Sequence, residues 1–160
     1  MNKNGEGILF MKVRYNLPCN IAQSLNIIGD RWSLLIIHEI FNGQNQFNEI
    51  KKALPGISSN LLSERLKYLE KQGLIQSALY SDHPPRYQYT ITKSGQDLET
   101  VFNALIIWGS QHLQKCYKKL IDPETGDEVE IAYVNKKTGQ PVERAEVISL
   151  EEEWQKTGED

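Results

Sequence analysis

The sequence lacks a long hydrophobic run, and this excludes one broad class of protein. No stretch of the 160 residues approaches the roughly 18 consecutive apolar residues of a membrane-spanning helix. The N-terminus does not show the succession of charged, apolar and small residues that marks a signal peptide. Together, these two absences predict a cytoplasmic protein that makes no contact with a membrane.

Cysteine is also scarce, because the chain has only Cys19 and Cys116. The two form no CxxC pair and no disulfide framework, which fits a reducing compartment. His112 and Cys116 are four residues apart and would share one face of a helix, but two ligands do not make a metal site. We therefore expect neither a metal ion nor another cofactor.

The motifs of common enzyme classes are missing as well. The sequence has no Gly-rich phosphate loop, no HExxH pair and no convincing set of nucleophile and base. The acidic residues are scattered, so no pair of carboxylates stands out as a catalytic acid and base. We expect that the protein is not an enzyme.

What the sequence does contain is enough apolar material for a core, together with an uneven distribution of charge. The hydrophobic fraction is 39%, with 7 Tyr, 4 Phe and 3 Trp, as in a folded globular protein. Residues 1–117 hold 12 Lys and Arg against 9 Asp and Glu, a net charge of +3. Residues 118–160 hold 6 against 12, a net charge of −6. A basic surface can therefore exist in a chain whose overall charge is −3.

Hydrophobic periodicity divides the chain into an N-terminal arm (1–18), a central domain (19–118) and an acidic extension with its tail (119–160). The central domain is predicted to hold helices at 20–28, 30–42, 46–53 and 59–72, strands at 74–80 and 86–91, and a long helix at 93–118. The helix at 30–42 is apolar around most of its circumference, so we expect it to be the central buried helix. Asp30 and Ser58 can cap the helices that follow them, and the Pro-Gly pair after residue 54 predicts a turn.

The extension carries an internal repeat. The run DPETGDEVE at 122–130 is echoed by NKKTGQPVE at 135–143, each with Thr-Gly, two residues and then Val-Glu. A glycine-centred turn between short strands, occurring twice, predicts a small β-ribbon. Residues 151–160 are expected to be a frayed acidic end.

Two short helices joined by a Pro-Gly turn and followed by a hairpin predict a winged helix-turn-helix, an α+β fold that is mainly α. In this arrangement one helix anchors its apolar face in the core and presents its polar face to the major groove of DNA. Its N-terminus favours phosphate, and a basic hairpin tip can enter the minor groove. The predicted DNA-contacting residues are Lys51, Lys52, Ser58, Ser59, Asn60, Ser63, Arg65, Lys67 and Arg86.

Several segments, in order, resemble the HxlR-type family of winged-helix regulators, which are MarR-like. The resemblance covers about residues 17–114 and rests on these pieces: Cys19-Asn20, Ile28-Gly29-Asp30-Arg31-Trp32, Phe47-Asn48-Glu49-Ile50, Leu54-Pro55-Gly56-Ile57-Ser58, Gly73-Leu74-Ile75, Pro84-Pro85-Arg86-Tyr87-Gln88-Tyr89 and Trp108-Gly109. It implies a homodimer built through the first and last helices of the domain, bound to a double-stranded DNA operator. It names neither the operator nor a small-molecule inducer.

Cys19 follows Pro18 at the expected start of a helix, where the helix dipole makes a thiolate more available. The family resemblance implies that a cysteine here senses oxidants or electrophiles in some members. The alternative is a small apolar residue at the dimer interface. A disulfide from Cys19 to Cys116 of the other chain is a further option.

The function predicted from the sequence is therefore that of a sequence-specific DNA-binding transcriptional regulator, more typically a repressor than an activator. The extension could serve as a dimer strut, a partner surface or an acidic shield over the basic face. The alternative function is a winged-helix protein–protein docking module that does not bind DNA.

Overall fold

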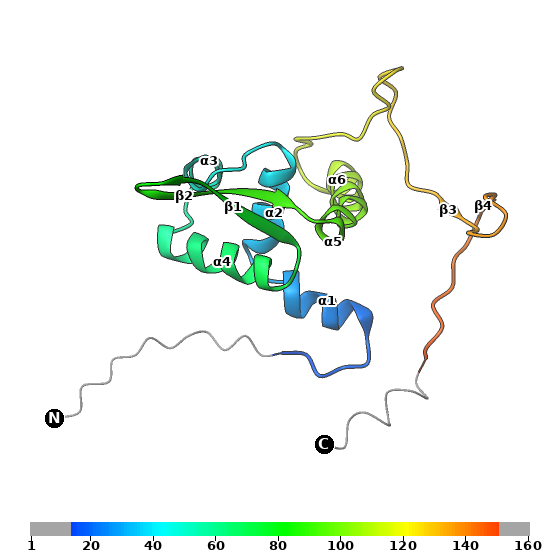
Figure 1. The fold of residues 1–160 in the computed structure, drawn as a ribbon. Helices are drawn as coiled ribbons and strands as arrows, with labels where there is room; N and C mark the ends of the chain where they lie inside the picture. Colours follow the sequence, from blue (N-terminus) through cyan, green and yellow to red (C-terminus); the bar gives the residue numbers. More distant parts are fainter. Residues whose placement is uncertain (1–13, 151–160) are drawn as a thin grey trace.

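The computed structural model describes residues 14–150 and contains a small helical body with a two-stranded wing and a separate extension (Figure 1). In chain order the elements are α1 (Asn20–Ile28), α2 (Ser33–Phe41), α3 (Phe47–Ala53), α4 (Ser59–Lys71), β1 (Ile75–Asp82), β2 (Pro85–Ile91), α5 (Lys93–Gln96), α6 (Glu99–His112), β3 (Tyr133–Val134) and β4 (Pro141–Val142). The predicted winged helix-turn-helix with a β-ribbon extension is confirmed. The predictions for residues 1–13 of the arm and 151–160 of the tail lie outside the described residues.

The core forms around α2, as its apolar circumference predicts. Ile36 and Ile37 are completely buried and Ile40 nearly so, while Ile50 of α3 and Phe102 of α6 pack in the same cluster. Asp30 lies in the turn before α2, which begins at Ser33 and not at residue 30 as predicted. Its Oδ1 accepts the backbone N–H groups of Trp32 and Ser33 at 2.9 and 3.0 Å. The N-cap position itself is Trp32, whose side chain makes no capping bond, so Asp30 supports the start of α2 from two residues further upstream.

The fourth helix has the predicted ends. Ser58 Oγ accepts the N–H of Leu61 at 3.1 Å, so it caps α4 at its N-terminus. Leu62, Leu66 and Leu69 form the buried stripe. At the other end Gly73 has φ = 71°, a left-handed conformation that glycine adopts without a Cβ penalty. Helix α4 is thus anchored on one face and leaves the opposite face to solvent.

The wing is longer than its predicted strands. The antiparallel register runs from Ile75 opposite Ile91 to Asp82 opposite Pro85, so the connecting turn is reduced to His83 and Pro84. The sequence-based prediction ended the first strand at Tyr80 because Ser-Asp-His-Pro-Pro is typical of loops. A shift in register between Leu79 and Ser81 absorbs the irregularity and lets the pairing continue to the tip.

The long helix predicted at 93–118 is wrong in two respects. It is interrupted at Asp97 and Leu98, where the N–H of Leu98 bonds to the carbonyl three residues earlier, at Gly95, instead of four. It also ends at His112, not at residue 118. Residues 113–119 are all exposed, so no packing offsets the entropy of extending the helix. His112 and Cys116 consequently do not share a helical face, and Cys116 is free and exposed.

The two repeats of the extension fold into two turns with the same hydrogen bonds. The N–H groups of Gly126 and Gly139 donate to the carbonyls of Asp122 and Asn135, each at 2.8 Å. The side chains of Asp122 and Asn135 accept the N–H two residues further on, at 2.8 and 2.9 Å. Both glycines have positive φ. The second turn joins β3 to β4, so the internal repeat in the sequence is a repeat in structure.

Candidate nucleic-acid interface

The solvent face of α4 carries the polar residues that the sequence singles out. Ser59, Asn60 and Lys67 are exposed, and Ser63 is half-buried on the same side of the helix. The positions between them on the opposite side, Leu62 and Leu66, are buried. The helix therefore presents a row of hydrogen-bonding groups outward from a fixed apolar base, as reading of the major groove requires.

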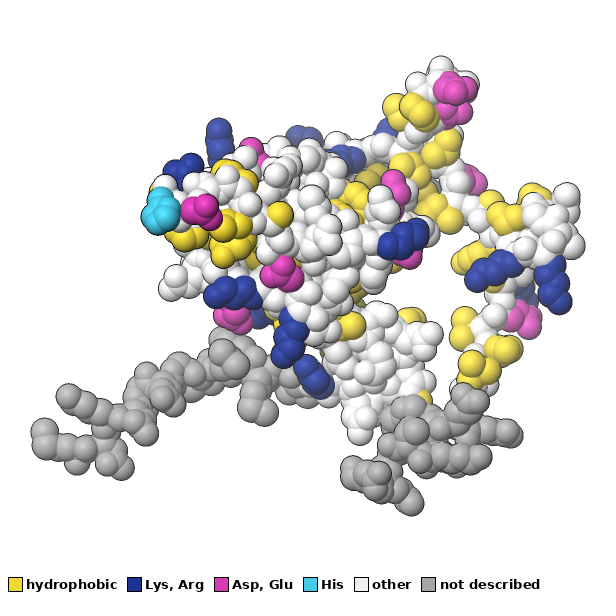
Figure 2. Space-filling model, in the orientation of Figure 1, with side chains coloured by type: hydrophobic (Ala, Val, Ile, Leu, Met, Phe, Trp, Pro, Cys, Tyr) yellow, Lys and Arg dark blue, Asp and Glu magenta, His cyan; other side chains and the backbone are white. Residues whose placement is uncertain are grey.

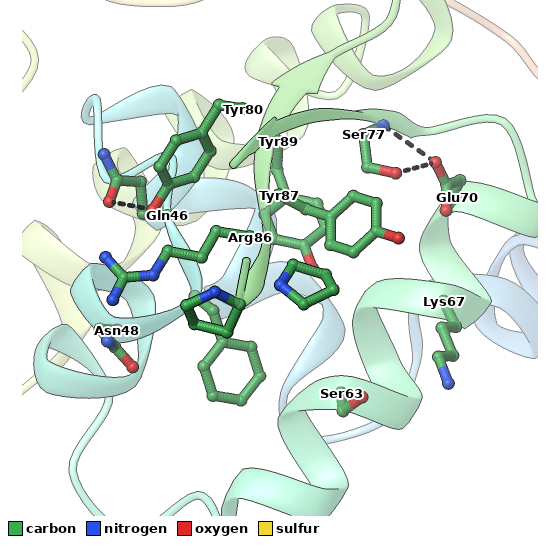
Figure 3. Close-up of a pocket in the computed structure, with 13 residues that line it drawn as sticks. Gln46, Asn48, Ser63, Lys67, Glu70, Ser77, Tyr80, Arg86, Tyr87 and Tyr89 are labelled. Atoms are coloured by element: carbon green, nitrogen blue, oxygen red, sulfur yellow. Dashed lines mark hydrogen bonds between the residues drawn. The ribbon is translucent and has the colours of Figure 1, made fainter. Parts of the chain in front are cut away.

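The wing lies beside this face and forms a groove with it (Figure 3). The groove has a volume of about 630 Å³, and Ser63 and Lys67 of α4 line one side. Arg86 and tyrosines of the wing line the other. In Figure 2, Lys and Arg side chains stand at the end of the molecule where Figure 1 places the wing. The structure thus brings Ser63, Lys67 and Arg86 together around one concavity.

The positive charges of the groove are not neutralised within the described chain. Neither Lys67 nor Arg86 forms an ion pair with any of residues 14–150. The carboxylate of Glu70 accepts hydrogen bonds from the backbone N–H and the hydroxyl of Ser77, at 2.9 and 2.6 Å. Burial, together with the charges of Glu70 and Tyr87, raises the pKa of Tyr89, which keeps that hydroxyl protonated. The groove thus carries two cations without acidic partners in this part of the chain, together with the Glu70 carboxylate.

The two lysines of α3 are placed differently from each other. Lys52 is exposed, whereas the Lys51 ammonium donates a hydrogen bond to the carbonyl of Ile57 in the turn before α4. This contact links α3 to the turn before α4. Glu49 also makes contacts within the fold. Its Oε2 accepts the N–H groups of Asn45 and Gln46, each at 3.0 Å, and so caps α3.

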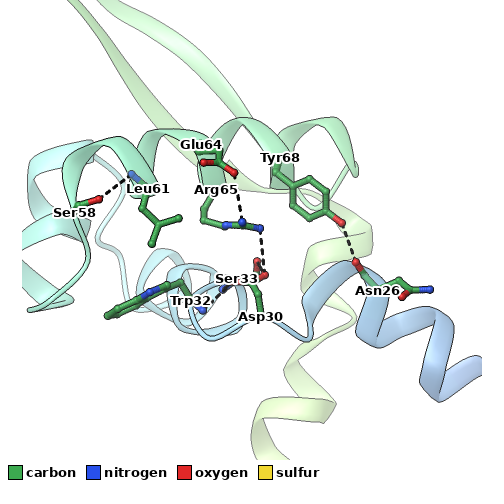
Figure 4. Close-up of polar contacts among 9 residues, drawn as sticks. All are labelled: Asn26, Asp30, Trp32, Ser33, Ser58, Leu61, Glu64, Arg65 and Tyr68. Carbon is green, nitrogen blue, oxygen red and sulfur yellow. Dashed lines mark hydrogen bonds and ion pairs between the residues drawn. The ribbon is translucent and has the colours of Figure 1, made fainter. Parts of the chain in front are cut away.

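Arg65 points inward and not toward the outer face of α4 (Figure 4). Its Nη1 lies 3.7 Å from Asp30 Oδ2, its Nη2 lies 3.4 Å from Glu64 Oε1, and its guanidinium stacks over the Tyr68 ring. In this arrangement the guanidinium of Arg65 is engaged inside the chain, and its contact with DNA stays a prediction. The ion pair with Asp30 competes for the side chain, and the sequence alone gave no sign of that pairing.

Asp30 is the centre of this cluster. Burial acts to raise the pKa of its carboxyl, but hydrogen bonds from the Ser33 hydroxyl and from the backbone of Trp32 and Ser33 outweigh it, with help from the Arg65 charge. The net effect holds the pKa of Asp30 below its ordinary value of 3.8. The carboxylate is therefore ionised at neutral pH, and it links the start of α2 to the middle of α4.

A second polar contact fixes the far end of α4. The Tyr68 hydroxyl donates to the carbonyl of Asn26 in α1 at 3.1 Å. Asn26 in turn is bonded to Tyr15 of the arm, through its Oδ1 and Nδ2, at 2.8 and 2.9 Å. Sequence reasoning missed Tyr68 and Asn26, because neither belongs to a local motif and 42 residues separate them.

Cys19 directly precedes α1 as its N-terminal flanking residue, as predicted, and its thiol is free and exposed. Apolar side chains near it are exposed too: Ile21 and Leu25 of α1 are 73% and 41% exposed. On α6, Leu105 and Trp108 are 51% and 57% exposed. Both terminal helices of the domain thus leave apolar surface uncovered within one chain.

The described residues contain neither a cluster of metal ligands nor a membrane-spanning helix. Within residues 14–150, no three His, Cys, Asp or Glu side chains are placed to hold a metal ion together. None of the helices in this part of the chain has the length and apolar character needed to cross a membrane.

Comparison with known proteins gives consistent matches to this arrangement. The family model for HxlR-like helix-turn-helix proteins matches residues 27–117. YtcD of Bacillus subtilis (strain 168), an uncharacterized HTH-type transcriptional regulator, is 29% identical over 106 residues, which are 66% of this chain and 82% of YtcD.

Two solved structures extend the comparison. PA1607, a candidate transcription factor, is 28% identical with a TM-score of 0.64, over 78% of this chain and 88% of its own. The redox regulator HypR in its oxidized form is 27% identical with a TM-score of 0.55, over 61% of this chain and all of its own. The first match reaches beyond the winged domain, whereas the second is confined to a smaller part of the chain.

Proposed function

The chain belongs to the family of HxlR-like helix-turn-helix proteins, and from this we propose that it is a sequence-specific DNA-binding transcriptional regulator that acts as a homodimer. The observation that carries the proposal is the groove between α4 and the wing, with Lys67 and Arg86 on its two sides. An anchored helix with a polar outer face, next to a basic hairpin, matches the shape and charge of a duplex. A regulator of this kind works where the chromosome lies, so the proposal includes a cytoplasmic location.

The residues divide into groups by their contacts. We assign base reading in the major groove to Ser59, Asn60 and Ser63, because short polar side chains on the outward face can reach base edges. Lys67 and Lys52 contact phosphates, and so does the N-terminus of α4 behind the Ser58 cap. Arg86 enters the adjacent minor groove from the wing.

Lys51 and Arg65 contribute indirectly in this proposal. Lys51 is bonded to the turn before α4 and Arg65 to Asp30, so both position the reading helix. Replacing either residue should change DNA affinity by moving α4, and should lower the free energy of unfolding as well. A phosphate-contacting lysine would change affinity alone.

The homodimer is proposed to form through α1 and α6. Their exposed apolar residues, which include Ile21, Leu105 and Trp108, are the surfaces that a second copy would cover. A two-fold dimer presents two α4 helices to DNA, so the operator should contain two half-sites related by symmetry, about one helical turn apart. Repression by blocking polymerase is the proposed output, and Cys19 is the proposed point at which oxidants act.

The test measures, by fluorescence anisotropy, the affinity of the purified protein for the DNA upstream of its own gene. A random duplex of the same length gives the reference affinity. We expect specific binding that weakens steeply with salt, since each phosphate contact releases counterions. The double variant Lys67→Ala, Arg86→Ala should lower affinity at least tenfold and reduce the salt slope by about two.

The matched control is Lys136→Ala, which removes an exposed lysine from the extension. It should leave both the affinity and the salt slope unchanged. Equal affinity for the upstream and random duplexes at every salt concentration would overturn sequence-specific regulation and favour the docking module.

A further inference from the structure

The extension, residues 119–150, exposes apolar side chains that a folded segment would bury. Ile131, Tyr133 and Val134 are 44%, 61% and 54% exposed, and Val142 is 37% exposed. Figure 1 shows the segment leaving the body after α6 and carrying β3 and β4 away from the helices, and Figure 2 shows hydrophobic side chains along it. A two-stranded hairpin is marginally stable by itself in water, so this one needs a surface to pack on.

The comparisons separate the extension from the core domain. The match to PA1607 covers 78% of the chain, about 125 of 160 residues, and so it runs past residue 118. The match to HypR uses all of the HypR chain but only 61% of this one. A related domain therefore folds without an extension. The extension is not needed to complete the core, and the apolar surface it carries is available for another contact.

The charges at the base of the extension are self-complementary. Lys115, Lys118 and Lys119 lie just after α6, and five acidic residues lie in the first turn, at 122–130. Lys119 pairs with Glu128 inside the chain. Lys115 and Lys118 have no acidic partner among residues 14–150.

The acidic side has unpaired members too. Asp127 and Glu130 have no basic partner within the described part of the chain. A surface that carries both members of a complementary pair is suited to a two-fold contact, in which each patch meets the opposite patch of the second copy. A contact of that kind would satisfy two sets of charges at once.

We propose that the extension packs on a second copy of this chain. The acidic turn 122–130 of one protomer lies against Lys115 and Lys118 of its partner, and Tyr133, Val134 and Val142 are buried at that contact. The contact continues the apolar face of α6, which ends three residues before Lys115. This inference rests on the homodimer proposed above and adds a second, charged and apolar interface to it.

Charge reversal in two separate variants tests the contact in the full chain. One variant carries Lys115→Glu and Lys118→Glu, and the other carries Asp127→Lys and Glu130→Lys. Each alone places like charges opposite each other in a homodimer, so its dimer dissociation constant in sedimentation equilibrium should rise at least tenfold over wild type. An equimolar mixture should recover wild-type association, because both contacts of the mixed dimer then join opposite charges.

Recovery on mixing is the result that a role within one chain cannot give. The proposal would be overturned if mixing the two variants did not restore association. It would also be overturned if each variant alone had the dimer dissociation constant of the wild type. A wild-type protein that sediments as a monomer would overturn the homodimer itself. A stable dimer whose dissociation constant neither variant changes would overturn only the contact proposed for the extension.

The apolar part has a separate test. Tyr133→Ser with Val142→Ser should weaken the dimer at least tenfold while leaving the thermal unfolding of the winged domain in place. The control is Leu79→Ser, which removes from the wing an apolar side chain whose exposed fraction, 48%, lies between those of Val142 and Tyr133. Equal dimer dissociation constants for the two variants would overturn burial of β3 and β4 in the interface.

Discussion

Gly95 lies at a close approach between α5 and the start of the wing. A Cβ at this position would be 2.1 Å from the carbonyl oxygen of Leu74 and 2.9 Å from Ile91 Cγ2. The first neighbour is backbone, held by the N–H of Thr92 at 3.1 Å, and cannot move aside cheaply. We expect Gly95→Ala to lower the free energy of unfolding by about 2 kcal/mol or more, measured by denaturant titration.

The control for that measurement is Gly109→Ala in α6. A Cβ there meets only the flexible end of Leu113, at 3.3 Å. Alanine also favours a helix interior over glycine by up to about 1 kcal/mol. Gly109→Ala should therefore be neutral or stabilising. Equal loss of stability in both variants would mean that the contact with Leu74 is not the cause.

Asp30 makes a prediction about pH. Because the pKa of its carboxyl is lowered by folding, the ionised form contributes stability that is present above the ordinary value of 3.8 and is lost as the pH falls through the lower folded pKa. Asp30→Asn keeps an acceptor oxygen but removes the charge, so it should lower the free energy of unfolding at pH 7 by about 1 kcal/mol through weaker hydrogen bonds and loss of the Arg65 ion pair. The variant should also lose part of the decline that the wild type shows below pH 4.

The measurement is chemical denaturation of both proteins across pH 3–7. The difference between them should shrink as the pH falls, since protonation removes the same interaction in the wild type. A difference that stays constant over this range would contradict the assignment of the stabilisation to the Asp30 carboxylate.

At the scale of elements, substitutions at the N-terminus of α4 can change the stability of the fold and the affinity for DNA independently. Ser58→Ala removes the acceptor of the Leu61 N–H and should lower the free energy of unfolding by about 1 kcal/mol. Ser58→Asp should restore that stability, because aspartate is an equally good cap. Its negative charge faces the phosphate proposed to bind there, so DNA affinity should fall, most strongly at low salt.

Denaturation and duplex binding measured on both variants check this pair of effects. If Ser58→Asp kept full affinity for the operator at low salt, the N-terminus of α4 would not approach a phosphate. If Ser58→Ala kept full stability, the hydrogen bond to Leu61 would contribute nothing to the fold.

Much of the element order could be predicted because local signals and packing agree. Helix α1 has the predicted ends, and α4 begins at its Ser58 cap and ends just before Gly73. The errors arise where tertiary context decides. The chain interrupts its last helix at Asp97, and nothing covers residues 113–119. Periodicity reports only the apolar positions, which continue through both places.

The placement of the candidate residues on the fold was predictable to a similar degree, while their contacts with DNA stay predictions. Residues on the outward face of α4 follow from spacing alone, since burial of the leucine stripe fixes which side is left. The inward turn of Arg65 could not be foreseen, because its partner Asp30 is 35 positions away, in the turn between α1 and α2. The repeat in the extension was visible in the sequence. That its apolar side chains stay exposed to solvent within one chain becomes apparent only from the structure.

At the scale of the whole molecule, the opposite charges of the two parts have separate consequences. The part that holds the winged domain is positive and the part that follows α6 is negative. If the negative part is held at the dimer contact, it stays away from the duplex, and a full-length chain can approach DNA despite its net charge of −3. The interface proposed for the extension and the proposed DNA surface are therefore compatible in one dimer.

Cys19 is placed where a change could affect both the proposed dimer contact and the proposed DNA surface. It directly precedes α1, which carries part of the proposed dimer face. Helix α1 is also bonded to α4, through Asn26 and Tyr68. Oxidation there should displace α1 and hence α4. We expect diamide to lower the affinity of the wild type for its operator at least tenfold, and to have no effect on Cys19→Ser. Dithiothreitol should reverse the change, since a disulfide is reducible.

Cys116→Ser identifies the partner thiol. A disulfide between Cys19 and Cys116 of the two protomers needs both residues, so Cys116→Ser would then resist diamide as Cys19→Ser does. A disulfide between the two Cys19 residues would leave Cys116→Ser fully sensitive, and non-reducing electrophoresis would show a crosslinked dimer in that variant. Loss of affinity that persists in Cys19→Ser would remove Cys19 as the point of control and leave DNA binding to be regulated elsewhere.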